Sequence, residues 1–155
     1  MRRRKAEKRT VVPDPKYESV LVTKTINRIM KDGKKGNAQH IFYTALDLVA
    51  KRTKSNPLEV FQVAIDNITP ELELKSRRIG GANYRIPIEV RSERKTVLAL
   101  KWLIIYAKKR SERRMSERIA GEIISAKDKT GGAFKQKETI HKMAKANRAF
   151  AHYRW

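Results

Sequence analysis

Lysine and arginine are the residues of this sequence best suited to chemistry, because both can bind phosphate. The chain of 155 residues carries 37 Lys and Arg against 16 Asp and Glu, a formal net charge of +21. A surplus of that size repels itself unless a polyanion neutralises it, and nucleic acid is the usual partner. An arginine guanidinium grips two phosphate oxygens at once. The composition therefore predicts a nucleic-acid-binding protein, with an anionic membrane surface as the alternative partner.

The charge is unevenly distributed along the chain. Residues 1–9 hold six basic side chains and one acid, residues 75–95 hold seven and two, and residues 108–118 hold six and two. Residues 57–74, by contrast, hold four acids and no basic residue. We therefore expect the three basic segments to face a polyanion and residues 57–74 to face away from it.

A catalytic or metal site is not predicted. The histidines His40, His141 and His152 lack the i, i+4 spacing of a helical metal site, and the sequence has no cysteine. It also lacks the glycine motifs of nucleotide-binding loops and the GxSxG motif of serine hydrolases. The loop DGKKGNA (32–38) has Lys34 beside a predicted helix start, where backbone N–H groups can hold one phosphate. We expect binding, with no enzymatic activity, cofactor or metal.

The elements that must position these residues are mostly helices. Apolar residues at helical spacing predict helices at about 19–33, 37–52, 57–68, 92–110, 115–127 and 134–150. Asn37 and Asn56 are the expected N-caps of the second and third helices, and Pro57 suits a first helical position. The helix at 92–110 is apolar nearly all round, so it should lie among the others. Gly121 indicates a close crossing. No stretch is apolar for long enough to span a bilayer, so we expect a soluble protein.

A β-hairpin interrupts the helices at about 71–91. Two-residue alternation replaces the helical period after Pro70, and Gly80-Gly81 provides a turn. A two-residue turn would mix apolar and polar positions on one face, so we prefer a loop of about five residues, 79–83. The resulting pairs are Leu72 with Val90, Leu74 with Ile88, and Arg77 with Arg85. The arginine pair is repulsive unless phosphate lies against the arm.

The predicted fold is mainly α: a six-helix single domain with one protruding two-stranded β-hairpin arm. Residues 1–18 are expected to form a flexible basic arm, residues 19–150 a helical RNA-binding domain, and residues 151–155 a basic and aromatic tail. Tyr84 shares a strand face with apolar residues, which favours packing over base stacking. The tail aromatics either stack on unpaired bases or dock on the domain.

Five segments resemble the small-subunit ribosomal protein seven family in its bacterial form. They are MRRRKAEKR, LVTKTINRIMKDGKKGNA, KSRRIGGANYRIPIEV, ALKWL and MAKANRAFAHYRW, and they follow the family's order from the first residues to the last. The resemblance implies a structural component of the cytoplasmic small (30S) ribosomal subunit. It implies a primary 16S rRNA-binding protein that initiates assembly of the head, in the 3′ major domain. It also implies a position near the mRNA exit path and the exit-site tRNA.

Further expectations follow from the same resemblance. Neighbouring proteins are the small-subunit proteins nine, eleven, thirteen and nineteen, and some family members repress their own mRNA. The implied rRNA contacts are Arg2, Arg3, Arg4, Lys5, Lys8, Arg9, Lys34, Lys35, Lys75, Arg77, Arg78, Arg94, Lys95, Arg110, Arg113, Arg114 and Arg118. The implied residues near tRNA and mRNA are Arg78, Gly80, Gly81, Arg85, Arg148, Tyr153, Arg154 and Trp155.

Two other functions remain as alternatives on the residues alone. The first is a DNA-bending architectural protein that uses the hairpin as a minor-groove arm. Such arms often carry an apolar or proline wedge at the tip, whereas Pro87 lies well down the strand. The second is an RNA-processing enzyme, for which no catalytic constellation is visible.

Overall fold

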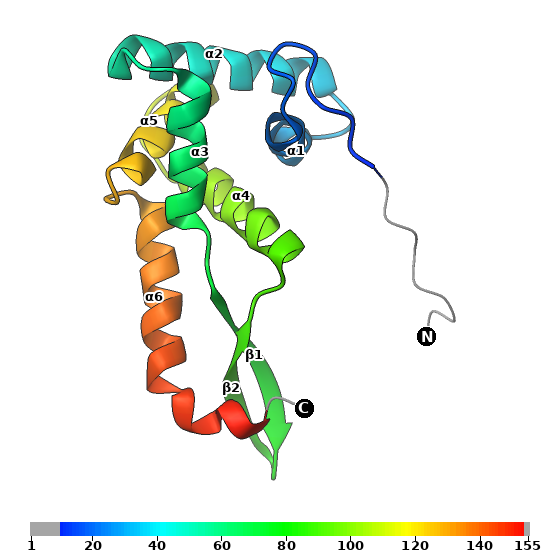
Figure 1. The fold of residues 1–155 in the computed structure, drawn as a ribbon, viewed down its shortest axis with the longest axis vertical. Helices are drawn as coiled ribbons and strands as arrows, with labels where there is room; N and C mark the ends of the chain where they lie inside the picture. Colours follow the sequence, from blue (N-terminus) through cyan, green and yellow to red (C-terminus); the bar gives the residue numbers. More distant parts are fainter. Residues whose placement is uncertain (1–9, 154–155) are drawn as a thin grey trace.

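The computed structural model describes residues 10–153, which form six α-helices, one 3₁₀ helix and one β-hairpin (Figure 1). In chain order these are α1 (Val20–Ile29), α2 (Lys35–Thr53), α3 (Pro57–Ile68), β1 (Leu72–Ile79), β2 (Ala82–Glu89), α4 (Ser92–Lys108), α5 (Met115–Lys127), α6 (Gly132–Ala146) and η1 (Arg148–Tyr153). The predicted mainly helical fold with one protruding hairpin is confirmed.

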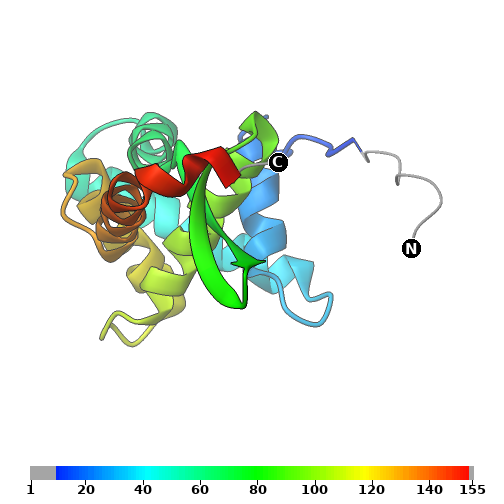
Figure 2. The same ribbon diagram turned by 90° about the horizontal axis from the view of Figure 1, so that it is seen from below.

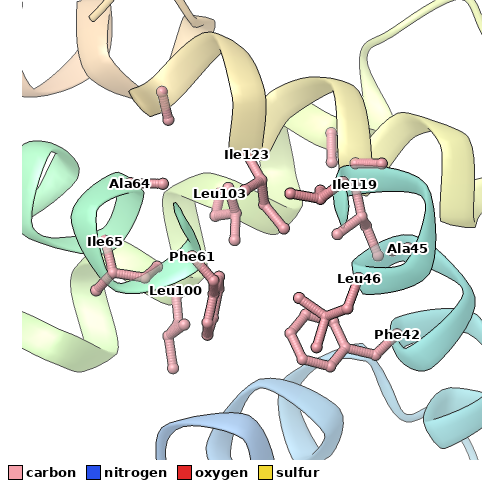
Figure 3. Packing of buried hydrophobic residues seen from close by; sticks show 14 of the residues in the cluster. Phe42, Ala45, Leu46, Phe61, Ala64, Ile65, Leu100, Leu103, Ile119 and Ile123 are labelled. Atoms are coloured by element: carbon pink, nitrogen blue, oxygen red, sulfur yellow. The ribbon is translucent and has the colours of Figure 1, made fainter. Parts of the chain in front are cut away.

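The core lies where α2, α3, α4 and α5 meet (Figure 3). Phe42 of α2 and Phe61 of α3 pack edge to face with their ring centroids 5.3 Å apart. Leu103 of α4 and Ile123 of α5 are fully buried in the same core. α4 packs against α1, α3, α5 and α6, which confirms its predicted place among the other helices. None of the helices in residues 10–153 is long and apolar enough to cross a membrane.

Local capping signals predict the start of α3 correctly. The side chain of Asn56 accepts a hydrogen bond from the backbone N–H of Leu58 at 3.1 Å, and Pro57 is the first helical residue. An N-cap oxygen satisfies one of the free amides of the first turn, and proline has no amide to satisfy there. The bounds of α5 also match the prediction, Met115–Lys127.

The junction between α1 and α2 differs from the prediction. α1 ends at Ile29, before the expected Gly33, and α2 begins at Lys35, so Asn37 lies inside the helix and does not cap it. The backbone of Asp32 and Gly33 is left-handed, with φ of 52° and 73°. Two left-handed residues reverse the chain tightly, which lets the next helix start earlier than an asparagine cap would allow.

The hairpin register is also not the expected one. β1 and β2 are joined by a two-residue turn, so that Leu74 pairs with Pro87 and Arg77 with Tyr84, and the preference for a five-residue loop is wrong. Gly80 and Gly81 have φ of 55° and 88°. Positive φ at both positions is the geometry that matches the twist of a hairpin. The predicted repulsive opposition of Arg77 and Arg85 therefore does not occur.

The assumption of a single apolar face caused the error in register. Ile86 and Pro87 are adjacent in β2, so their side chains lie on opposite faces, yet both are buried. β1 packs on α6 and β2 packs on η1, so neighbouring elements cover a twisted ribbon from more than one side (Figures 1 and 2). Such a ribbon has no need for one continuous apolar face.

Two side chains of α6 fix the root of the hairpin. The Nε2 atom of His141 accepts a hydrogen bond from the backbone N–H of Glu71 at 3.2 Å. The Nζ atom of Lys137 donates to the carbonyl of Asn67 at 2.8 Å. Burial lowers the pKa of both side chains, and the positive charge of Lys137 lowers that of His141 further. His141 is therefore held as the neutral imidazole that this hydrogen bond needs.

Residues 10–18, the described part of the predicted arm, are anchored to the helices at Asp14. The Asp14 carboxylate is buried and accepts hydrogen bonds from the backbone N–H groups of Lys16 and Tyr17. It also accepts the hydroxyl of Tyr43 in α2 at 2.8 Å. Burial first, and then this hydrogen bond, raise the pKa of Tyr43 to about 12. The basic residues Arg2, Arg3, Arg4, Lys5, Lys8 and Arg9 lie outside the described residues.

Candidate nucleic-acid interface

A groove at the ends of four helices brings together basic residues that are far apart in the sequence. Lys34 precedes α2 and Arg118 belongs to α5, yet both line this groove. Lys31 and Lys108 line it as well, and sequence reasoning did not single them out. We call this site the α2–α5 groove. Its grouping of cations depends on the packing of α1, α2, α4 and α5, which residue spacing alone does not reveal.

Arg118 is held in place inside the α2–α5 groove. Its Nε atom donates to the carbonyl of Glu112, and its Nη1 atom donates to the carbonyl of Lys108 at 3.5 Å. The lysines of the groove form no ion pair within residues 10–153. One oriented guanidinium and several exposed ammonium groups are well suited to bind phosphate.

The hairpin carries a second basic site at its tip. Arg78 and Arg85 are exposed on either side of the turn made by Gly80 and Gly81, and neither makes an ion pair in the described part of the chain. Arg77 is half-buried and has an interaction within the chain. Of the three arginines in the hairpin, Arg78 and Arg85 are therefore the two that form no ion pair within residues 10–153 and are exposed at the tip.

Acidic Glu73 offsets the basic residues at the hairpin root. Its carboxylate lies 2.7 Å from Nε of Arg94 and 3.8 Å from Nζ of Lys75. The Glu73 side chain is only 14% exposed, whereas that of Arg94 is 56% exposed. These two predicted RNA contacts are thus partly neutralised inside the protein. Lys95 is half-buried nearby, in the first turns of α4.

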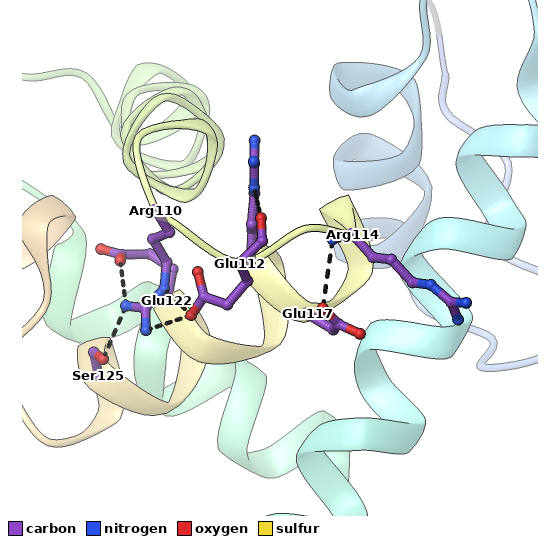
Figure 4. A network of polar contacts seen from close by, with 7 residues as sticks. Arg110, Glu112, Arg114, Glu117, Glu122 and Ser125 are labelled. Carbon is purple, nitrogen blue, oxygen red and sulfur yellow. Dashed lines mark hydrogen bonds and ion pairs between the residues drawn. The ribbon is translucent and has the colours of Figure 1, made fainter.

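Arg110 joins three helices from within the protein (Figure 4). Its guanidinium lies 2.9 Å from the carboxylate of Glu112 and 3.4 Å from that of Glu122, whose side chain is 2% exposed. Glu122 in turn accepts the backbone N–H of Ala133 at the start of α6, at 2.8 Å. A Cβ at Gly121 would lie 2.8 Å from this guanidinium, so the glycine makes room for the Arg110 side chain, whereas the sequence had suggested a close crossing of helices there.

This network gives one residue of the basic segment at 108–118 a structural role. Arg110 stabilises the packing of α4, α5 and α6, and an RNA contact for it remains a prediction. The backbone N–H of Glu112, and then the Arg110 guanidinium, hold the pKa of Glu112 below its ordinary value against the effect of burial. Arg113 and Arg114 are exposed beside the network, and the Arg114 side chain points away from its carboxylates (Figure 4). Together with Lys108 of the α2–α5 groove, they are exposed cations of this segment that can meet a polyanion.

The carboxyl-terminal aromatic residues dock on the hairpin. The Tyr84 ring lies 5.0 Å from that of Phe150 and 6.4 Å from that of Tyr153, between ring centroids. Of the two readings left open for the tail, docking on the domain is the one observed for Tyr153. Arg148 is exposed at the start of η1, and Arg154 and Trp155 lie outside the described residues.

Side chains that could support catalysis do not gather within residues 10–153. No cluster of three His, Cys, Asp or Glu side chains suited to a metal ion occurs there. His141 is occupied at the hairpin root, and Nδ1 of His152 lies 2.8 Å from the carbonyl of Ala149. The arrangement is suited to binding a polyanion at several separate points.

Comparison with known proteins gives the same family across nearly the whole chain. Residues 1–148 match the family described as ribosomal protein S7p/S5e. The small ribosomal subunit protein uS7 of Natranaerobius thermophilus is 60% identical over 150 residues, which is 97% of this chain and 96% of that protein. The protein of the same name from Mycoplasmopsis agalactiae is 58% identical over 154 residues, 99% of each chain. The one from Desulfitobacterium hafniense is 56% identical over 148 residues.

Proposed function

The chain belongs to the ribosomal protein S7p/S5e family, and on that premise we propose that it binds 16S rRNA as a structural component of the small ribosomal subunit. It is a ribosomal protein and not an enzyme. The relatives at 56–60% identity are all small ribosomal subunit proteins. One observation of the structure supports the RNA-binding role above the others. Exposed cations that form no ion pair within residues 10–153 lie at two separate places, the hairpin tip and the α2–α5 groove.

The mechanism is recognition of a folded RNA by shape. Each basic site neutralises phosphates, and each bound phosphate releases condensed counterions. The helices hold the two sites at fixed positions relative to each other, because α6 packs on β1 and η1 packs on β2 of the hairpin. Only an RNA whose phosphates match both positions satisfies them together, so the spacing of the sites provides selectivity without base-specific contacts.

The finer role follows from the family. The protein is a primary binder of the 3′ major domain of 16S rRNA, it initiates assembly of the subunit head, and its hairpin tip and carboxyl terminus lie near the mRNA exit path and exit-site tRNA. The cytoplasmic small subunit also provides its neighbours, proteins nine, eleven, thirteen and nineteen. Repression of its own mRNA would use the same surface, since mRNA presents the same phosphate chemistry. The basic arm of residues 1–18 supplements the two described sites.

Binding measured against salt tests this function. A fragment of the 16S rRNA 3′ major domain, tRNA and duplex DNA are titrated separately with the whole protein. For about eight phosphate contacts, log K should fall with log salt at a slope of roughly −6 to −7 on the rRNA fragment. The fragment should bind far more tightly than the other two at 0.15 M salt. Equal affinity for all three nucleic acids would overturn the proposal, and tightest binding to the duplex DNA would favour the architectural alternative.

A further inference from the structure

The floor of the α2–α5 groove is apolar. Met30 directly follows α1, Ile41 lies in α2 and Met115 begins α5, and all three line the groove and are half-buried. Their side chains pack on the hydrophobic core on one side and face the groove on the other. Phosphate binding alone does not explain this apolar floor, because apolar side chains cannot donate hydrogen bonds to phosphate oxygens.

The rim of the same groove is cationic. Lys31, Lys34 and Lys108 are exposed, Arg118 is oriented by two backbone carbonyls, and none of the described residues that line the groove is acidic. The first turn of α2 opens at this rim, with no side-chain cap and no acidic residue. Its free amides and positive helix end favour an anion at the rim.

The size of the groove limits what can occupy it. Its volume is about 520 Å³, in the range of sites that hold one small organic molecule and far too small for a nucleic-acid helix. A second copy of this chain is disfavoured by charge, because two chains that each carry a net charge of +21 repel one another. An occupant must therefore be flat or compact, apolar on one part and anionic on the other.

We propose that the α2–α5 groove binds a single unpaired RNA nucleotide, with its base on the methionine–isoleucine floor and its flanking phosphates on the cationic rim. This inference rests on the proposed RNA-binding function. Bases in loops and bulges are free to leave the stack, and their faces are apolar while the backbone beside them is charged. Methionine side chains are flexible and polarisable, so this floor accommodates purines and pyrimidines alike.

The test separates the floor from the rim. Met30→Ala and Met115→Ala together remove the floor, and Met143→Ala on α6, an exposed methionine outside the groove, is the matched control. With the 16S rRNA 3′ major-domain fragment, the double variant should lose 5- to 100-fold in affinity, as loss of one base contact does. The slope of log K against log salt should stay unchanged, because no phosphate contact is removed. The control should bind as the wild type does.

Chemical probing of the RNA gives a second, independent readout. One unpaired base should be protected from base-modifying reagents by the wild-type protein and by Met143→Ala, and exposed again with the double variant. Circular dichroism verifies that each variant is folded. If the double variant is unfolded, the footprint of the wild-type protein alone decides whether an unpaired base is bound. Wild-type affinity of a folded double variant, or a footprint confined to the phosphate backbone, would overturn the nucleotide site while leaving the proposed function standing. Loss of rRNA preference by the wild type would instead refute the function itself.

Discussion

The hairpin root and the α2–α5 groove both carry basic residues, but their charge is partly neutralised by a carboxylate at the root and not in the groove. Arg94 and Lys75 share the nearly buried carboxylate of Glu73. Lys31 and Lys34 form no ion pair within residues 10–153. The contrast teaches that a count of lysines and arginines does not locate an RNA-binding surface. On the proposed function, we expect that surface where those charges form no ion pair within the described chain.

Removing the groove lysines should have the largest effect on RNA binding. The triple variant Lys31→Gln, Lys34→Gln and Lys108→Gln should reduce the steepness of the salt dependence by about 2–3 and lower the affinity on the order of 100-fold, since each lost phosphate contact removes one counterion-release step. Titration of the 16S rRNA 3′ major-domain fragment at several salt concentrations measures both quantities.

The matched control removes three exposed lysines elsewhere. Lys51, Lys54 and Lys129 lie outside the groove, and replacing them by Gln changes the net charge by the same amount. We expect the control to lower the affinity much less. Equal losses for the two triple variants would mean that net charge alone drives binding, and the distinction between regions would fail.

The hairpin tip should show a smaller loss. The double variant Arg78→Ser and Arg85→Ser should lower rRNA affinity about 10-fold, because it removes two of the phosphate contacts, and should leave the thermal unfolding midpoint unchanged. Arg77→Ser provides the contrast, since Arg77 is half-buried and has an interaction within the chain. That single variant should lower the unfolding midpoint instead. A tip variant that enters ribosomal subunits and binds rRNA normally would argue against the tip site.

Removing the carboxylate at the root should make the two regions alike. Glu73→Gln frees the charges of Arg94 and Lys75, so we expect rRNA binding to tighten about 2- to 3-fold and the salt dependence to steepen by less than 1. The free energy of unfolding should fall by less than about 1 kcal/mol, because these pairs are largely exposed on their basic side. Weaker binding by this variant would show that Glu73 positions Arg94 for RNA rather than neutralising it.

The smallest effect concerns the pH dependence of stability. The pKa of His141 is lowered by burial and by Lys137, so the unfolded chain binds more protons than the folded one between the folded pKa and the unfolded value of about 6.5. The stability that depends on neutral His141 is full above that value and is lost as the pH falls towards the folded pKa. Unfolding midpoints measured from pH 7.5 to 5.5 should fall less steeply for His141→Gln than for the wild type. The exposed His40→Gln variant should match the wild type.

Local sequence signals predicted some elements and missed others for physical reasons. Asn56 and Pro57 fix the start of α3 by contacts within four residues, so the sequence was sufficient there. The hairpin register depends on α6 and η1 covering both faces of the ribbon, which no alternation pattern expresses. The role of Arg110 likewise appears only when the chain turns between α4 and α5 and brings Glu122 to it. The grouping of cations in the α2–α5 groove also depends on how the helices pack, because its residues come from separate parts of the chain.

The two attachments of the hairpin have a mechanical consequence. A strand of eight residues extends about 26 Å, so a rotation of about 10° at a root held only by His141 and Lys137 would move the tip by roughly 4–5 Å. Tyr84 is held by Phe150 and Tyr153 only a few residues from the turn, which leaves a free length of about 10 Å. The same rotation about that point moves the tip by less than about 2 Å. The hairpin is therefore held at two points, at its root by α6 and near its tip by η1, and the contacts of η1 limit the movement of the tip.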